Sequence, residues 1–379
     1  MQSIKTKAGI DVSAKTLTGV RRRGGEEEQR DFANEAVGHR ELLKWVGKAA
    51  RVCVEATGVY HLQLALTLRA AGVEVTVLNP RVAKDFARAL ANRSKTDEVD
   101  AWTLLEYVER MEFVAWAVPS EAVLELRELG RRLKELVQTA VDEKNRLHAK
   151  TVSGVSKTVA ADVKAHVAQI EKRIKQIETA AVEVVQGDAY LQEQFQILRG
   201  IPGVGRRSAI QLLTELAVLD PTMSVKQLVA YAGLDPRRYE SGTSVKKPAR
   251  ISKMGTARLR AILYMIALSA VRHDRGARLF FARLVARGKK KKQALVAVMR
   301  KLLHGIWIVL QRRVAFESSV LFAASLAQAE SSDSAVAATK PEPSQDHPQG
   351  RSKAEELRQQ LDPGSAEATR SRKKRPKAA

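Results

Sequence analysis

Four acidic residues have the types and spacing of a metal-binding site. Asp11 lies in a strand-like segment at 8–12, and Glu55 ends a short β-branched run. Asp97 and Asp100 are three residues apart at the start of an expected helix, so they share a face. Strand ends and helix starts converge at one edge of an α/β sheet, where four carboxylates would repel one another without cations. Mg²⁺ (or Mn²⁺) favours such oxygen ligands, and two ions about 3.5–4 Å apart can hold a phosphodiester.

Each acid also has a simpler interpretation. Asp11 alone can end a strand, and Asp97 alone can cap the helix that follows Thr96. A single acid is more often solvated than catalytic. It is the combination that points to a metal site: one acid within a strand, another at a strand end and a pair on one helical face.

A serine in a cation-rich segment is the candidate nucleophile. Ser241 precedes Gly242, which permits close approach of another backbone. A serine hydroxyl is a weak nucleophile that needs a base or a metal to activate it. Taken alone, Ser241 is simply a turn residue, and Ser244 and Ser252 compete with it as candidates.

Two glycines precede an apolar helix expected at 208–216. Gly203 and Gly205 allow backbone N–H groups to approach a phosphate at the helix N-terminus. Arg206 and Arg207 add positive charge there. The pattern resembles a helix-hairpin-helix motif, which binds the DNA backbone whatever the base sequence. The alternative is an ordinary glycine-rich turn between helices.

The net charge of the 379-residue chain is +23, and the pI is about 10.2. A compact chain with this charge repels itself unless a polyanion neutralises it. Nucleic acid is the favoured partner, because neutralised phosphates release counterions, and an anionic membrane surface is the alternative. The other basic residues expected to contact nucleic acid are Arg237, Arg238, Lys246, Lys247, Arg250, Lys253 and Arg258.

The apolar content sets further expectations. No run of 18 or more apolar residues appears, so no membrane span is expected, and the N-terminus lacks the apolar stretch of a signal peptide. The single cysteine, Cys53, lies in an apolar run and is expected to be a core residue. One cysteine can form neither a disulfide framework nor a zinc ligand set. We therefore expect a cytoplasmic protein.

The chain divides into four expected segments. Residues 1–118 alternate strand and helix signals, among them a short apolar strand at 73–78 that Asn79-Pro80 is expected to end, which predicts an α/β domain. Residues 119–192 carry apolar residues in a four-three alternation, which predicts coiled-coil helices that turn back near Gly154 or, alternatively, two helices packed on a globular domain. Residues 193–320 are expected to be mainly helical and basic. Residues 329–379 have the composition of a disordered tail with a basic end.

Three blocks resemble the signatures of DEDD transposases from bacterial insertion sequences of the one-ten type. They are Gly9-Ile10-Asp11-Val12-Ser13, Glu55-Ala56-Thr57-Gly58 and Lys95-Thr96-Asp97-Glu98-Val99-Asp100-Ala101. A second series, from Gly233-Leu234-Asp235-Pro236 through Ser241-Gly242 to Arg250-Ile251-Ser252-Lys253-Met254-Gly255, is similar to the C-terminal transposase domain of the same family. The two sets occur in the family's order and cover residues 8 to about 310.

The resemblance implies an N-terminal RNase H-like (RuvC-like) domain and a C-terminal serine transposase domain. It implies that Asp11, Glu55, Asp97 and Asp100 bind the metal, and that Ser241 attacks DNA to form a covalent phosphoserine link. It also implies a structured guide RNA, double-stranded DNA of element ends and target as substrate, and a homodimer or homotetramer.

Two other functions are compatible with parts of the sequence. A structure-specific junction-resolving endonuclease, with metal-activated water in place of Ser241, accounts for the carboxylates but not for the C-terminal blocks. An architectural nucleic-acid-binding protein would have merely solvated acids. A covalent protein–DNA adduct separates the first from a transposase, and metal-dependent cleavage excludes the second.

Overall fold

The computed structural model describes residues 5–56, 58–91, 96–154, 156–241 and 245–328, with only the backbone described at 238–241 and 245–249. The described residues up to Ala327 form one compact unit. The basic tail expected at 329–379 lies outside the described residues.

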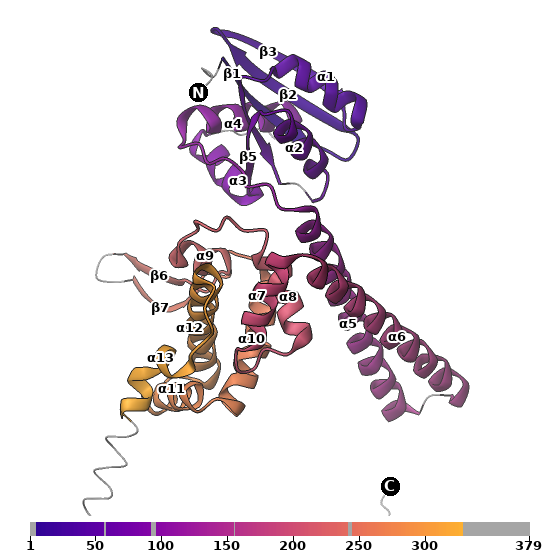
Figure 1. The fold of residues 1–379 in the computed structure, drawn as a ribbon, viewed down its shortest axis with the longest axis vertical. Coiled ribbons are helices and arrows are strands. Elements are labelled where there is room, and N and C mark those ends of the chain that lie inside the picture. Colours follow the sequence, from indigo (N-terminus) through magenta and orange to yellow (C-terminus); the bar gives the residue numbers. More distant parts are fainter. Residues whose placement is uncertain (1–4, 57, 92–95, 155, 242–244, 329–379) are drawn as a thin grey trace, which may run out of the picture. The chain divides into compact units, whose positions relative to one another are not determined.

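The N-terminal part of the chain folds as a mixed sheet with helices (Figure 1). Its elements are β1 (Thr6–Val12), β2 (Thr16–Arg23), β3 (Glu26–Ala33), α1 (Ala36–Val46), β4 (Ala50–Glu55), α2 (His61–Ala70), β5 (Glu74–Leu78), α3 (Pro80–Ala89) and α4 (Asp97–Arg110). The strand order is β3-β2-β1-β4-β5. Strand β2 is antiparallel to β1 and β3, whereas β1, β4 and β5 are parallel. The expected α/β domain is confirmed, and the sheet is consistent with an RNase H-like domain.

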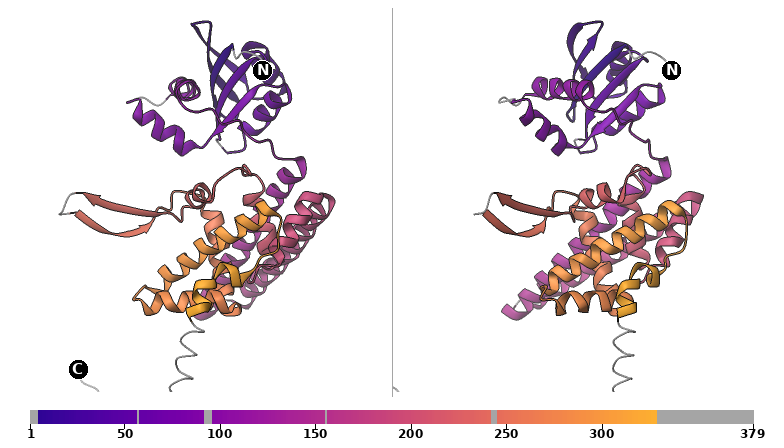
Figure 2. Two further views of the ribbon diagram at one scale, coloured as in Figure 1. Left: turned by 60° about the vertical axis from the view of Figure 1, so that its left-hand side comes forward. Right: turned by 90° about the vertical axis from the view of Figure 1, so that its left-hand side faces the viewer.

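Both faces of this sheet are covered, which explains the apolar runs of its central strands. One face carries Ile10 and Val54 and packs against α1 and α2. The other face carries Cys53 and packs against α3 and α4 (Figure 2). A strand buried on both faces has apolar residues at consecutive positions.

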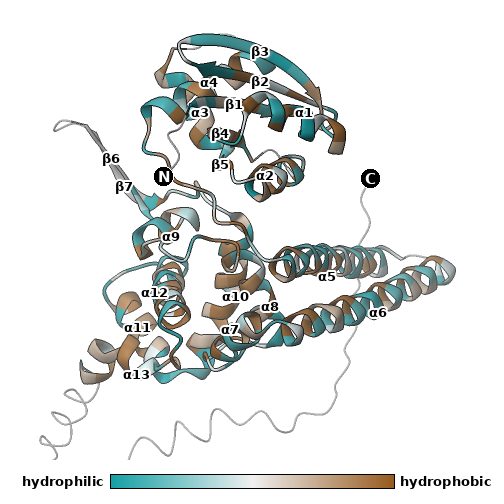
Figure 3. Cartoon of the chain, turned by 45° about the horizontal axis from the view of Figure 1, so that its top comes forward, coloured by the Kyte–Doolittle hydropathy of each residue, from teal (hydrophilic) through white to brown (hydrophobic). Residues whose placement is uncertain are grey.

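Two elements of this part were not expected from the sequence. Strand β3 is exposed at every position except Phe32, and it is hydrophilic along most of its length (Figure 3). As the edge strand it needs no apolar alternation. Helix α3 follows Asn79-Pro80, which we expected only to end a strand. Instead the Asn79 side chain caps the helix by accepting from the Arg81 N–H at 2.9 Å, and Pro80 occupies the first helical position.

Two long helices follow, α5 (Glu121–Ser153) and α6 (Lys157–Gly187), and they pack along each other. Helix α5 ends at Gly154 with a left-handed φ of 82°, which turns the chain back as expected. The apolar positions of α6 at Ile170 and Ile174 are buried within the chain. The apolar positions of the four-three pattern therefore have apolar partners within the chain.

The C-terminal part is mostly helical, as expected. Its elements are α7 (Ala189–Arg199), α8 (Arg206–Leu216), α9 (Val225–Tyr231), β6 (Pro236–Ser241), β7 (Val245–Ile251), α10 (Ala257–His273), α11 (Arg275–Ala286), α12 (Lys291–Arg312) and α13 (Ser318–Leu321). The α5–α6 pair and helices α7–α12 share one apolar core. The antiparallel β6–β7 hairpin is a correction, because we expected only a basic loop there.

Helix α12 is long and apolar enough to cross a membrane by length and composition alone. However, 61% of its most apolar 18-residue window is buried inside the protein. Its Leu303 and Ile306 are completely buried in the helical core. These contacts are typical of the central helix of a packed domain, because a core helix is apolar on nearly every side.

Candidate active site and nucleic-acid interface

The sheet places two of the four predicted acids side by side. Strands β1 and β4 are parallel neighbours, with Ile10 opposite Val54 as the last pair of the ladder. The next residue on each strand is Asp11 and Glu55. Alternation along a strand puts both on the face that carries Cys53, which is the face covered by α4.

Helix α4 brings the other two acids to this face because Gly9 allows it to lie directly on β1. A Cβ at Gly9 would overlap the backbone of Ala101 and Leu105 in α4. The side chain of Thr96 caps α4 by accepting from the Val99 N–H at 3.2 Å. The alternative interpretation of Asp97 as the cap is therefore wrong, and Asp97 and Asp100 both lie in the first turn.

The electrostatics of Asp11 show that the four carboxylates form one cluster. The pKa of Asp11 is raised to about 6, first by burial and then by the negative charges of Asp97, Asp100 and Glu55; a hydrogen bond from the Val12 backbone opposes the rise. Among the described residues, no group of three or more acidic, histidine or cysteine side chains is already arranged to hold a metal ion. The acids thus lie within electrostatic range without forming a closed ligand set. Their all-oxygen donor set fits Mg²⁺ or Mn²⁺.

Cys53 lies two residues before Glu55, on the same face of β4, but does not belong to the site. Its side chain is completely buried. Burial and the neighbouring Glu55 raise the pKa of the thiol, so it stays protonated. The expectation of an inert core residue is confirmed.

The candidate nucleophile lies on the β6–β7 hairpin. Ser241 is the last residue of β6 and pairs with Val245 of β7. Ser244 falls outside the described residues. The Ser252 hydroxyl donates to Asp235 and accepts from the Met254 N–H, which fixes it in the turn at the hairpin base. That structural role weakens Ser252 as a competing nucleophile.

The base of this hairpin is tightly packed, which explains several residues of the C-terminal block. Gly233 has a left-handed φ of 62°, and a Cβ there would press on the backbone of Gly255. A Cβ at Gly255 would in turn overlap the Tyr231 carbonyl. Arg260 donates to the carbonyls of Ala232 and Gly255 at 3.0 and 2.9 Å. These glycines therefore position the hairpin.

The hairpin itself carries unbalanced positive charge. Arg237 and Arg250 lie opposite each other in the ladder, and both are exposed. Lys246 and Lys247 belong to β7, and Arg238 belongs to β6. Lys253 follows at the base with a φ of 54° and is exposed. Like charges directly across a strand pair are unfavourable, so this ribbon suits an anionic partner.

The glycine-rich turn before α8 presents one open glycine and one packed glycine. Gly205 and Arg206 are exposed at the start of α8, and nothing lies within 4 Å of a Cβ built on Gly205. Gly203 has a left-handed φ of 90°, and a Cβ there would press on Ile266 and Ala270 of α10. Its main role is thus to let the turn pack on α10.

Two arginines predicted to bind nucleic acid have partners inside the protein. Arg207 pairs with Glu178 of α6 at 2.7 Å. Arg258 pairs at 2.9 Å with Glu215 of α8, which is only 5% exposed. The sequence did not reveal these partners, because the pairs join residues 29 and 43 positions apart.

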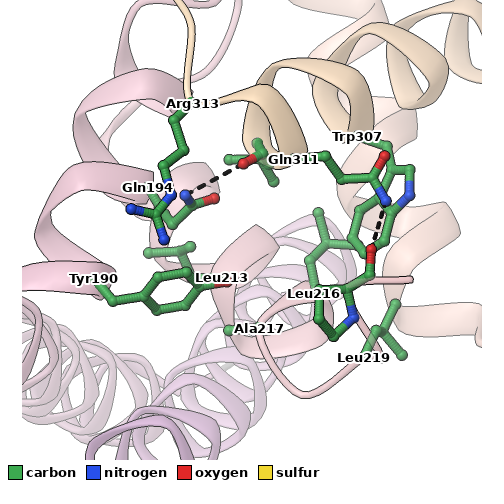
Figure 4. Close-up of a pocket in the computed structure, with 11 residues that line it drawn as sticks. Tyr190, Gln194, Leu213, Leu216, Ala217, Leu219, Trp307, Gln311 and Arg313 are labelled. Atoms are coloured by element: carbon green, nitrogen blue, oxygen red, sulfur yellow. Dashed lines mark hydrogen bonds between the residues drawn. The ribbon is translucent and has the colours of Figure 1, made fainter. Parts of the chain in front are cut away.

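A cavity of about 110 Å³ lies among α7, α8 and α12 (Figure 4). Its lining is largely apolar, and two of its polar side chains bond to nearby carbonyls: Gln194 to Leu310 at 3.4 Å and Gln311 to Pro221 at 2.7 Å. Arg313 is the charged side chain among the described residues that line it. The described residues of this lining include no carboxylate, serine or cysteine, so we do not treat the cavity as a second candidate site.

Comparison with known proteins agrees with both motif sets. A family profile of DEDD transposases of the IS110 type, described as "Transposase", matches residues 8–153. A second profile, described as "Transposase IS116/IS110/IS902 family", matches residues 195–282. The β1, β4 and α4 acids fall within the first match, and the β6–β7 hairpin falls within the second.

Curated relatives extend this likeness over most of the chain. The "Pilin gene-inverting protein" of Moraxella bovis is 27% identical over 324 residues, which are 83% of this chain and 99% of the relative. The "Putative transposase y4rJ" of Sinorhizobium fredii is 26% identical over 321 residues, 71% of this chain and 79% of the relative. The "Transposase for insertion sequence element IS1111A" of Coxiella burnetii is 30% identical over 136 residues, 35% and 36% of the two chains. With two family profiles matched in order, the chain belongs to the IS110 family of insertion-sequence transposases, a family of DNA recombinases.

Proposed function

We propose that this chain cleaves and rejoins DNA strands through a serine–phosphate intermediate formed at a Mg²⁺-dependent (or Mn²⁺-dependent) site. The observation that carries the proposal is the clustering of Asp11, Glu55, Asp97 and Asp100: burial, together with the charges of the other three acids, raises the pKa of Asp11 to about 6. Four carboxylates held together repel one another, and a bound cation would remove that repulsion. The family membership supports DNA as the substrate.

The proposed chemistry is a phosphoryl transfer. The Ser241 oxygen bonds to the scissile phosphorus as it gives up its proton, and the bond from phosphorus to a DNA sugar oxygen breaks. The sugar oxygen leaves and takes up a proton. When bound, the metal supplies charge neutralisation and activation of the attacking oxygen. The phosphoserine conserves the energy of the broken bond, so rejoining to a second strand needs no ATP.

The basic surfaces of the chain would bind and orient the nucleic acid. We assign Arg237, Arg238, Lys246, Lys247 and Arg250 of the hairpin to phosphate contacts. Gly205 and Arg206 at the start of α8 would form the contact surface of a helix-hairpin-helix motif, with Gly203 packing the turn. Lys253 at the hairpin base, together with Arg207 and Arg258 through their paired but partly exposed side chains, would add contacts at the edge of this surface.

Several finer properties belong to the same proposal. They are a structured guide RNA that pairs with the DNA, a homodimer or homotetramer that joins carboxylates of one copy to Ser241 of another, coiled-coil character in the α5–α6 pair, and a cytoplasmic, nucleoid-associated location. The Moraxella relative is named for inverting a pilin gene. That name suggests that this chain also recombines pairs of defined DNA sites.

The replacement of Asp11 tests the metal-dependent half of the proposal. Asp11→Asn removes one negative ligand but leaves the size of the side chain unchanged, so the protein should fold and bind DNA. Recombination of plasmid-borne sites in Mg²⁺ should fall by about a hundredfold or more. The matched control is Asp31→Asn, an exposed acid on β3 outside the cluster, which should keep full activity. Equal recombination by Asp11→Asn and Asp31→Asn would remove the carboxylate site from the mechanism.

A further inference from the structure

Positive side chains gather around the start of α10, outside the carboxylate site. Arg127, Arg131 and Lys134 project from α5, and Arg258 lies in the first turn of α10. Arg127 and Arg131 are one helical turn apart, so their like charges lie on one face. The acid beside them is Glu215, which is buried and already paired with Arg258. The cluster therefore holds a clear excess of positive charge.

Arg131 is the residue of this cluster that most needs a partner. Its Nε atom is buried and has no hydrogen-bond partner in the described part of the chain. Burial, followed by the charges of Arg127 and Arg258, lowers the pKa of Arg131. A buried donor without an acceptor and a guanidinium between two others are both unfavourable unless an anion joins them.

The N-terminus of α10 adds backbone donors at the same place. Thr256 precedes α10, but its hydroxyl donates to Glu215 at 3.3 Å and does not cap the helix. The first turn holds no acidic residue. The N–H groups of the first helical turn lack intrahelical acceptors and carry the positive end of the helix dipole. These donors thus add to the positive field of the arginines.

A cavity joins the two sets of donors. Its walls include Arg127, Arg131, Tyr231, Thr256 and Arg258, together with Ala257 in the first turn of α10. Tight packing holds the α5 wall in place, because a Cβ at Gly130 would overlap the Thr214 side chain of α8. Thr214 adjoins Glu215 in the sequence, so the same contact positions the partner of Arg258. Packing on the helical core therefore fixes the α5 wall of the cavity, and Asn79 of the N-terminal part also belongs to the lining.

We infer that Arg127, Arg131, Arg258 and the first turn of α10 bind a backbone phosphate of a nucleic acid. Guanidinium groups and helix N-termini both match the oxygens of a phosphate, and together they fix its position without reading bases. The inference rests on the proposed function for the identity of the nucleic acid. It adds an anchoring site that neither the hairpin nor the turn before α8 provides.

Binding measurements on the full-length chain test this site. Arg131→Gln and Arg127→Gln remove one charge each, and Arg132→Gln on the same helix is the control, because Arg132 is exposed and pairs with Glu135. The affinity for a fluorescent DNA duplex is measured by anisotropy over a range of salt concentrations. In parallel, the melting temperature is measured as inorganic phosphate replaces chloride at constant ionic strength.

We expect Arg131→Gln to weaken duplex binding and to lower the slope of log K against log salt by about one. Phosphate should raise the melting temperature of the unmodified chain and of Arg132→Gln, but not that of Arg131→Gln. The melting temperature without phosphate shows that the variant is folded, since removing a repelling charge should not destabilise it. Arg127→Gln should give the same pattern more weakly, because Arg127 is not the unpartnered group.

Two results would overturn the inference. One is a salt slope and a phosphate response of Arg131→Gln equal to those of Arg132→Gln. The other is loss of the phosphate response with an unchanged duplex slope, which would mean a site for a free oxyanion only. Neither measurement involves strand cleavage. A protein that shows the expected binding pattern but no recombination would therefore refute the proposed function and leave the phosphate site in place.

Discussion

The proposed acids and the proposed nucleophile stand on opposite kinds of scaffold. Asp11 and Glu55 end central strands of a sheet that is covered on both faces, and α4 lies against β1 at Gly9. Ser241 ends one strand of a two-stranded hairpin that is fixed at its base by packed glycines. A two-stranded ribbon is only marginally stable in water by itself.

This difference has a physical reason. Four carboxylates that repel one another would move apart unless a rigid core held them, so they need a sheet with buried faces. The repulsion between Arg237 and Arg250, which lie opposite each other, destabilises the hairpin. The same exposed positive charges can form ion pairs with phosphates. Under the proposed mechanism, the carboxylate site is organised before substrate binds, and the hairpin gains its ionic partners from the substrate.

The largest expected effect concerns the sheet that carries the acids, at the contact between β1 and α4. Gly9→Ala places a methyl group against the α4 backbone, which cannot rotate away as a side chain can. We expect the free energy of unfolding to fall by about 3 kcal/mol or more, together with loss of recombination. Urea denaturation followed by circular dichroism measures the change.

The control is Gly187→Ala, because nothing lies within 4 Å of a Cβ at Gly187. Alanine favours helix more than glycine does, so this change at the end of α6 should be neutral or slightly stabilising. Equal stability of the two variants would mean that α4 is not held on β1 at Gly9.

A smaller effect concerns the pH dependence of the metal-free protein. The pKa of Asp11 is about 6 in the folded chain against 3.8 as its ordinary value. Stability from this group is therefore fully present below pH 3.8 and is lost as the pH rises through about 6. Because the side chain is partly exposed, we expect about 1 kcal/mol between pH 5 and 7.5 after allowance for solvent screening.

Chemical denaturation in EDTA at pH 5 and at pH 7.5 measures this change in the free energy of unfolding. Asp11→Asn should lack it, whereas Asp31→Asn should keep it, so the informative quantity is the difference between the variants. Mg²⁺ should reduce the loss at high pH, because metal binding competes with the proton. An identical pH response in Asp11→Asn and the unmodified chain would show that the acids do not interact as one cluster.

The smallest expected effect concerns the β6–β7 hairpin. Arg237→Glu converts a repelling cross-strand pair with Arg250 into an attractive one, which should stabilise the hairpin by about 0.5 kcal/mol. Amide hydrogen exchange of β6 and β7 should slow, while DNA affinity falls. Arg237→Gln should lie between the two. Faster amide exchange in Arg237→Glu would contradict the view that repulsion between Arg237 and Arg250 destabilises the hairpin.

The sequence predicted the elements in which local pattern and burial agree. The apolar strands at β1, β4 and β5 and the α4 helix were expected, and with them the convergence of the four acids. Strand β3 was missed because its pairing with β2 is a matter of edge position, not of apolar residues. Helix α3 was missed because Asn79-Pro80 can end a strand or begin a helix, and here it does both.

The sequence predicted less of the C-terminal half of the site. Most residues of the hairpin are polar or basic, so no apolar alternation revealed its two strands. The packing roles of Gly203, Gly233 and Gly255 depend on contacts with distant elements, which no local pattern contains. For the same reason Arg127 and Arg131 were not recognised as candidates: their charges look like the solvated positions of a long helix until α10 is placed beside them.

The most direct test of the whole account is the identity of the residue that becomes covalently attached to DNA. The unmodified chain is incubated with Mg²⁺ and nicked DNA that carries its recombination site, and the protein–DNA species that resists denaturant is digested and mapped by mass spectrometry. We expect the DNA to be attached at Ser241, with no adduct from Ser241→Ala and normal adduct formation by Ser244→Ala and Ser252→Ala. Attachment at Ser244 or Ser252, or hydrolytic cleavage without any adduct, would contradict the account, and the second result would favour a junction-resolving nuclease that uses water.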